Sequence, residues 1–264
     1  MVSHSVTQFL LWLSPALAIV ALFVAYWMLR RKNMYRRELP RVFELHDLVM
    51  PSSSPDSYFR NFEQSLSEIR QKLRQFRDIE ADLQGLDAEA WAFLKSEVAP
   101  LLRVRHLTRG WQFLFDKLNQ AKAYNYLKSA GYPNVRFIPP SAVPGQQTPD
   151  LEADGVLCEV KTINVSDAEA NRRHSGGVGS VADQLDEGFF RKLSSDLKKA
   201  KAQMVSYDNR SKHIVYIIAN FDDSLHEYAD RYQRQIDRYV AVDPVPGLQL
   251  VVFDVKPPFY TAMA

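Results

Sequence analysis

The dipeptide Asp154-Gly155 restricts how this chain can fold more than any other feature of the sequence. Two strand-like runs flank it, Pro149–Ala153 and Val156–Ile163. Asp-Gly is favoured in two-residue hairpin turns, because both central residues of such turns need a positive φ. A turn of this length fixes the register, so that Ala153 lies opposite Val156. The sequence therefore predicts an antiparallel hairpin with defined side-chain pairing.

Counting outward from this turn places two carboxylates together. Asp150 is expected opposite Glu159, with Cβ atoms about 4.5–5.5 Å apart. Carboxylates that close repel each other unless a cation or a proton lies between them, and their oxygens suit a hard divalent ion such as Mg²⁺. Strand alternation puts Lys161 on the same face as Glu159, and it turns Cys158 and Val160 to the other face, toward the core.

Lys161 could orient a water molecule beside a bound divalent ion, help to deprotonate it, or stabilise charge that develops on a phosphate. The alternative is a surface hairpin that carries a Glu–Lys pair and a nearby aspartate. Glu-x-Lys alone is common, so the argument depends on the whole set of residues on both strands.

The elements from Thr108 to Val255 predict an α/β sandwich with a mixed sheet. Gly131 is expected to end the first helix. In chain order the predicted elements are a helix over Thr108–Ser129, a strand over Val135–Ile138, the two hairpin strands, a helix over Asp186–Tyr207, a strand over Ile214–Ala219, a helix over Leu225–Val240 and a strand over Leu248–Val255.

Pro149-Asp150 followed by Glu159-Val160-Lys161 resembles the signature of the PD-(D/E)XK nuclease superfamily. The resemblance covers roughly Trp111–Val255 and implies a restriction-endonuclease-like α/β/α sandwich. It also implies a metal-dependent nuclease in which Asp150 and Glu159 bind Mg²⁺ (or Mn²⁺). In such an enzyme Lys161 serves the attacking water, and the Val160 carbonyl is a further metal ligand.

The resemblance extends to two helices. Some members carry Gln-x-x-x-Tyr on the helix after the motif strands, and Gln203 and Tyr207 match this spacing on one helical face. Members often have a glutamate on the first helix, where this chain has Gln120, with Asp116 one turn earlier. Gln120 can bind by hydrogen bonds but brings no charge, so one metal ion is better supported than two.

Cations on the predicted helix from Asp186 are interpreted as a contact for a phosphate backbone or as a solvated face. They are Arg191, Lys192, Lys198, Lys199 and Lys201, of which Lys199 is named as a substrate-binding candidate. The segment Asn164–Asp183 is expected to be a loop that closes over substrate or merely connects two elements.

The segment Phe9–Leu29 has no charged residue and is long enough to cross the roughly 30 Å hydrocarbon core as a helix. A cleaved signal peptide fits less well, because no Lys or Arg precedes the segment and the apolar run continues past Ala16-Leu17-Ala18. A buried core helix is a third interpretation. Basic residues follow and place the rest of the chain in the cytoplasm; they are Arg30, Arg31, Lys32, Arg36 and Arg37. Contact of these cations with anionic lipid or nucleic acid is the alternative.

Composition limits the partners and the cofactors. The net charge of the chain is +2, so a nucleic-acid partner cannot be inferred from charge alone. The single cysteine, Cys158, fits a reducing compartment. The six histidines show no ligand-like spacing, so zinc is not expected.

The predicted organisation has four parts. Residues 1–38 form the anchor with its basic segment, 39–57 a linker (with little structure over Pro40–Asp56), 58–106 a helical extension and 107–264 the nuclease-like domain. The extension combines a helix over Tyr58–Leu83 with a second one that Asp87 caps and that runs to Leu102. It is interpreted either as a dimerisation or partner-binding element, in a homodimer for example, or as helices packed on the domain that follows.

Two hypotheses result. The first is a membrane-anchored, cytoplasm-facing nuclease that depends on Mg²⁺ and acts on DNA rather than RNA. The second is a catalytically inactive protein of the same fold that serves as a binding scaffold at the membrane.

Overall fold

The computed structural model describes residues 20, 22–23, 26–27, 30–49, 57–145, 147–164, 166–176, 183–219 and 228–253. These residues divide into two compact units. One lies within Met1–Asp47 and Asn61–Glu80, and the other within Leu48–Arg60 and Ala81–Ala264. The proposed membrane segment falls almost entirely outside the described residues. Within the part of the chain that the structure describes, no helix is long and apolar enough to cross a bilayer.

The smaller unit corrects the predicted linker. Helix α2 (Pro40–Val49) occupies the first part of the segment that was expected to have little structure, and 50–56 lie outside the described residues. Proline is favoured at the first position of a helix, where its missing N–H costs nothing. Behind it the apolar side chains of Val42 and Phe43 are buried, and Val42 N donates to the Glu80 carboxylate at 2.8 Å. Tertiary burial therefore makes this segment helical.

The single helix expected over Tyr58–Leu83 is two helices, α3 (Phe62–Glu68) and α4 (Arg70–Gln84). The break is at Ile69, whose backbone is extended (φ −116°, ψ 94°). The predicted helical spacing is retained inside each piece. Phe62 packs edge-on against Phe76, with ring centroids 4.9 Å apart.

The larger unit starts with helices whose ends follow the predicted signals. Asp87 caps α5 (Ala88–Val98) by accepting from Ala90 N at 2.9 Å, and the 3₁₀ turn Ala99–Arg103 continues it. The helix predicted over Thr108–Ser129 begins later and is divided at Asn119 into α6 (Gln112–Leu118) and α7 (Gln120–Ser129). Gly131 follows it with φ +82°, in the left-handed conformation that ends many helices.

The predicted mixed sheet is confirmed, and it has the order β1-β2-β3-β4-β5. The first two pairings are antiparallel and the last two are parallel. Ala153 pairs with Val156 as predicted, and Gly155 has φ +70°. The strands are β1 (Arg136–Phe137), β2 (Leu151–Ala153), β3 (Val156–Ile163), β4 (Lys212–Ala219) and β5 (Leu248–Phe253).

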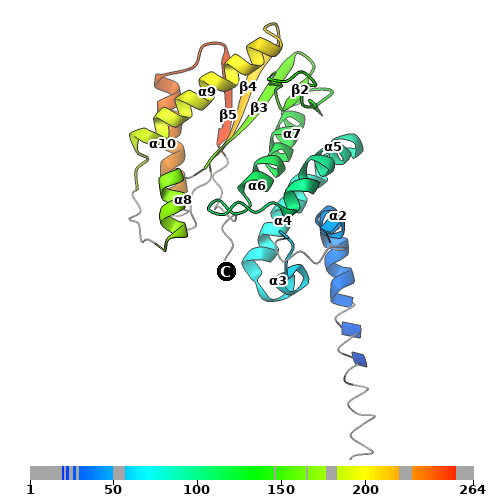
Figure 1. The fold of residues 1–264 in the computed structure, drawn as a ribbon. Coiled ribbons are helices and arrows are strands. Elements are labelled where there is room, and N and C mark those ends of the chain that lie inside the picture. Colours follow the sequence, from blue (N-terminus) through cyan, green and yellow to red (C-terminus); the bar gives the residue numbers. More distant parts are fainter. Residues whose placement is uncertain are drawn as a thin grey trace, which may run out of the picture. The chain divides into compact units, whose positions relative to one another are not determined.

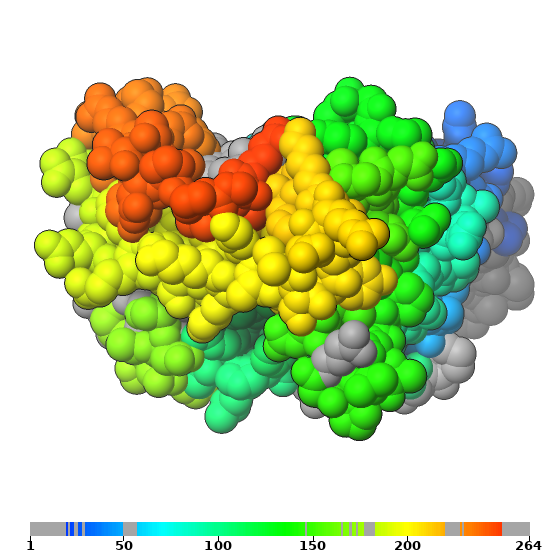
Figure 2. All heavy atoms as spheres, turned by 90° about the horizontal axis from the view of Figure 1, so that it is seen from above, coloured from blue at the N-terminus to red at the C-terminus, as the bar shows by residue number. Residues whose placement is uncertain are grey.

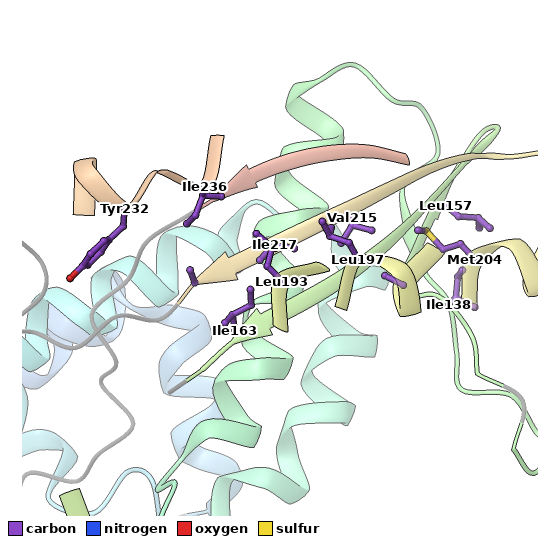
Figure 3. Packing of buried hydrophobic residues seen from close by; sticks show 12 residues of the cluster. Ile138, Leu157, Ile163, Leu193, Leu197, Met204, Val215, Ile217, Tyr232 and Ile236 are labelled. Atoms are coloured by element: carbon purple, nitrogen blue, oxygen red, sulfur yellow. The ribbon is translucent and has the colours of Figure 1, made fainter. Parts of the chain in front are cut away.

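Helices cover both faces of this sheet (Figure 1). On one face lie α9 (Glu187–Tyr207), which Asp186 caps, and α10 (Ala229–Val242). Figure 3 shows the core that they enclose with β3 and β4, including Leu193, Leu197, Met204, Val215, Ile217 and Ile236. On the other face α7 packs on the sheet, where Tyr126 contacts Tyr216 with ring centroids 5.7 Å apart. Burial on both faces explains why β4 reads as a continuous apolar run.

The loop predicted over Asn164–Asp183 contains a helix, α8 (Asp167–His174). The prediction was wrong for these residues, which include strong helix formers such as alanine, glutamate and arginine. Residues 165 and 177–182 lie outside the described part.

At the opposite end of the sheet, Lys212 N donates to Gly155 O at 2.8 Å. Figure 2 shows the end of α9 and the start of β4, in yellow, against the green of the β1–β3 segment.

Candidate active site

Asp150 lies beside β3 and immediately precedes the first residue of β2, Leu151. The β2–β3 ladder stops at the Leu151–Cys158 pair, one residue before the predicted pairing of Asp150 with Glu159. The Asp150 carbonyl instead accepts from Ile138 N at 3.0 Å. Its side-chain Oδ2 accepts from Val160 N at 2.8 Å, so the carboxylate takes the place of a backbone partner for β3.

Gln120 holds the other oxygen of this carboxylate. The Gln120 Nε2 donates to Asp150 Oδ1 at 2.6 Å, and the glutamine itself is buried at the start of α7. The residue at the position where nucleases with a similar motif often carry a glutamate therefore contacts the first carboxylate directly. Its amide orients Asp150 without adding a charge.

Glu159 is on β3, on the face that α9 covers, and only 3% of it is exposed. Its Oε1 accepts from Lys161 Nζ at 2.5 Å and its Oε2 from Gln203 Nε2 at 2.9 Å. Gln203 also donates to Thr148 O at 2.7 Å, so its amide joins α9 to the segment that leads to Asp150. Both oxygens of each carboxylate are thus fixed by hydrogen bonds.

Burial raises the pKa of both carboxyl groups. For Glu159 burial acts first and the nearby Asp150 second, against the opposing effect of Lys161, and together they raise its pKa to about 7. For Asp150 burial raises the pKa against the opposing effects of the Val160 N–H and of Lys161. Glu159 therefore holds a proton near neutral pH when no cation balances the two neighbouring carboxyls.

The donors present fit a small divalent cation. An ionised carboxylate offers about four acceptor sites, so the four hydrogen bonds above leave lone pairs on Asp150 and Glu159. The Val160 carbonyl points to the same side of β3 as its N–H, which is the side where Asp150 lies. Within the described ranges no group of three or more His, Cys, Asp or Glu residues forms a metal cluster. Mg²⁺ usually keeps several of its waters when it binds to a protein. Two carboxylates and a carbonyl, with water completing the coordination shell, therefore suit this ion better than a site made of protein ligands alone.

The other predicted substrate-binding residues are on the surface of α9. Lys199 lies one turn before Gln203 and is exposed, and Tyr207 lies one turn after it with 39% of its surface exposed. The i, i+4 spacing puts these three side chains on one side of the helix. Gln203 contacts Glu159, whereas binding of substrate by Lys199 and Tyr207 stays a prediction.

A second polar group, of which the sequence analysis named only Asp116, lies at the carboxyl end of β3. Asn164 Nδ2 donates to Asp116 Oδ1 at 3.4 Å, and Asn119 Nδ2 donates to Thr162 Oγ1 at 3.2 Å. Burial raises the pKa of Asp116, while hydrogen bonds from Asn164, Gln112 and Thr162 act in the opposite direction. Strand alternation places the Thr162 side chain on the same face of β3 as that of Val160. This was the one sequence signal from which the polar group could have been predicted.

Comparisons with protein families, with curated proteins and with solved structures found no match in any of the three. Only the residues of the chain itself therefore bear on its function.

Proposed function

We propose that this protein is a metal-dependent nuclease that hydrolyses phosphodiester bonds in DNA. The observation that carries the proposal is that buried Glu159 and partly buried Asp150 lie close enough to raise the pKa of Glu159, with the Lys161 ammonium in contact with Glu159. Burying two like charges destabilises a fold. Carboxyl groups perturbed in this way are typical of catalytic and metal sites.

Asp150, Glu159 and the Val160 carbonyl would hold Mg²⁺ or Mn²⁺. The bound cation would polarise a phosphate oxygen and make a coordinated water more acidic. This is the set of ligands that the resemblance to PD-(D/E)XK nucleases implies.

The chain's own residues prepare the site for hydrolysis. Water adds to phosphorus while one P–O ester bond breaks; the water loses a proton, and the leaving oxygen gains one. Lys161, held at Glu159, can donate a hydrogen bond to that water or to a phosphate oxygen. Gln120 and Gln203 keep the two carboxylates in fixed orientations, so little reorganisation is needed when substrate binds.

The topology supports a restriction-endonuclease-like arrangement. A helix precedes three antiparallel strands, and the crossover helix α9 leads to β4, which is parallel to β3. The motif residues lie just before β2 and on β3, as the resemblance implies.

The proposal includes a membrane anchor over Phe9–Leu29 with the nuclease domain in the cytoplasm, and it depends on the apolar and basic pattern of the sequence. Among the basic residues that follow, Lys32 pairs with Glu63 and Arg36 pairs with Asp47 within the smaller unit. These ion pairs favour topology and local packing over nucleic-acid binding as the role of this basic segment.

The test uses the full chain purified in mild detergent and incubated with linear and circular DNA. We expect cleavage with Mg²⁺ and none with a chelator. Lys161→Ala should lower the rate by roughly 10²–10⁴-fold, a range typical of a positioned proton-transfer group. Lys95→Ala on α5 is the matched control and should cleave like the unmodified protein. Cleavage by Lys161→Ala with chelator present would refute the mechanism.

A scaffold of the same fold is the second candidate. The observation in its favour is Gln120, an uncharged residue next to Asp150. Calorimetric titration with Mg²⁺ and Mn²⁺ separates the two, because the scaffold is expected to bind neither ion and the nuclease at least one.

A further inference from the structure

The loop before α6 is a closed turn that presents an apolar side chain to solvent. His106 N donates to Gly110 O at 2.8 Å, and Gly110 N donates back to His106 O at 2.9 Å. Gly110 has φ +55°, so the closure uses a conformation that glycine adopts easily. Leu107 lies within this three-residue loop, and 78% of it is exposed.

Contacts of the His106 side chain hold the loop in this conformation. The His106 Nδ1 accepts from Thr108 N at 3.3 Å and from Arg109 N at 3.2 Å. The imidazole ring in turn packs edge-on against Phe113 of α6, with ring centroids 5.8 Å apart. Leu107 is therefore held outward by a preformed turn, which lowers the entropy that a binding partner would otherwise have to remove.

The chain segment that forms the loop is basic, although the whole chain is nearly neutral and Asp167 of α8 pairs with Arg109. No Asp or Glu occurs between Glu97 and Asp116, while this stretch contains Arg103, Arg105 and Arg109. Arg103 and Arg105 are exposed. An apolar tip between arginines matches a polyanion whose interior is apolar, which describes a nucleic-acid duplex.

Hydrogen bonds join the loop to α6 and α8, and the chain leads on from α6 to the candidate active site. Arg109 donates to Gln112 Oε1 at 2.7 Å and pairs with Asp167 of α8. From Gln112, eight residues along α6 and α7 lead to Gln120, which contacts Asp150.

We propose that Leu107 inserts between base pairs of duplex DNA bound at the candidate active site, while Arg105 contacts the backbone. Side chains of this type open base steps and kink the duplex in many DNA-binding proteins. The inference rests on the proposed nuclease function and adds its substrate class: the site takes a duplex that the loop deforms. A membrane surface is the competing partner for an apolar, basic loop. The loop leads directly into α6, and α7, which follows α6, carries Gln120 at the candidate site; this connection favours DNA.

The first experiment measures base unstacking without cleavage. The full chain carrying Lys161→Ala is mixed with duplexes that contain 2-aminopurine at successive positions, whose fluorescence rises when the base leaves the stack. We expect a several-fold rise confined to one or two adjacent steps. Adding Leu107→Ala should abolish the rise, and adding Val242→Ala, which also shortens an exposed apolar side chain (Val242 is 85% exposed, on α10), should not. A rise that persists with Leu107→Ala overturns the proposal.

The second experiment separates failure of this inference from failure of the function. With Lys161 intact, Leu107→Ala should lower the ratio of duplex to single-strand cleavage by about tenfold, the effect expected of losing an intercalating side chain. Cleavage with an unchanged ratio overturns the wedge and leaves the nuclease standing. No cleavage of any DNA by the unmodified chain overturns both.

A third measurement identifies the partner. Leu107→Cys can be labelled with an environment-sensitive dye, because Cys158 is the only native cysteine and is buried. In neutral-lipid nanodiscs the dye should shift to shorter wavelength when duplex is added. A shift on changing the lipid to phosphatidylserine, with none on adding duplex, would assign the loop to the membrane and overturn the proposal.

Discussion

Replacing Glu159 by glutamine tests whether the negative charge of this buried carboxylate lowers the free energy of unfolding. The carboxyl has an ordinary pKa of 4.5, which burial and the neighbouring Asp150 raise to about 7. Below about pH 4.5 the group is protonated in both the folded and the unfolded chain, so it costs nothing. Between these pKa values the unfolded chain releases its proton first, and the folded state loses stability as the pH rises. Above about pH 7 the full cost is present.

The size of the effect follows from the shift. A difference of about 2.5 pKa units corresponds to roughly 3 kcal/mol, an order-of-magnitude figure for a group that is almost fully buried. The glutamine carbonyl can accept from Lys161 or from Gln203, and the loss of one bond costs about 1 kcal/mol. We therefore expect Glu159→Gln to stabilise the metal-free protein by about 2 kcal/mol at pH 8. Near pH 5 removing the charge gains only about 1 kcal/mol, which the lost hydrogen bond offsets, so the stability should be unchanged there.

The assay is thermal unfolding of the full chain in chelator, followed by tryptophan fluorescence, to which Trp91 and Trp111 of the larger unit contribute. A gain of about 2 kcal/mol corresponds to about 4–8 °C in Tm for a unit of this size. Mg²⁺ should raise the Tm of the unmodified protein at pH 8 more than that of Glu159→Gln. Glu152→Gln, on the neighbouring strand β2, is the control, and Mg²⁺ should raise its Tm at pH 8 as much as that of the unmodified protein. An equal change of Tm at pH 5 and pH 8 for Glu159→Gln would refute the reasoning.

Three further predictions concern the support of the site. Gln203→Ala should weaken Mg²⁺ binding by about 10–100-fold in calorimetry, since residues that orient a metal ligand have effects of this size; an unchanged affinity would contradict the role of its amide. Gly155→Ala should lower the free energy of unfolding by about 1 kcal/mol, because the hairpin turn needs φ +70° there and a Cβ would meet no atom within 4 Å. Leu197→Ala, which empties part of the core under α9, should cost about 2–5 kcal/mol in chemical denaturation, and a cost under 1 kcal/mol would show that α9 is not held by this core.

Features that depend on a few neighbouring residues were predictable from the sequence. The pairing of Ala153 with Val156 follows from a two-residue turn, and Asp87 and Asp186 begin helices by accepting from backbone N–H groups three residues ahead. Gly131 ends α7 for a similarly local reason. In each case one backbone conformation or one hydrogen bond decides the structure.

Features that depend on distant packing were not predictable in this way. Pro40 and the segment after it looked like a linker, but Val42 and Phe43 become helical because they are buried against residues far along the chain. The hydrophobic pattern also gave no indication of the breaks at Ile69 and Asn119. Each break leaves the apolar spacing on both sides intact.

The candidate site combines both kinds of feature, and the distinction bears on what its motif means. The turn placed Asp150 and Glu159 near each other, but it did not predict that Asp150 leaves the ladder to bind Val160 N. Nor could it predict the burial of Glu159, because Gln203 comes 44 residues later and reaches it only through the crossover to α9. The raised pKa of Glu159 is therefore a property of the packed sheet and helix. In a chain with the same short motif but no helix over β3, this glutamate would be exposed, its pKa would stay close to 4.5, and the repulsion that a divalent cation relieves would be weak.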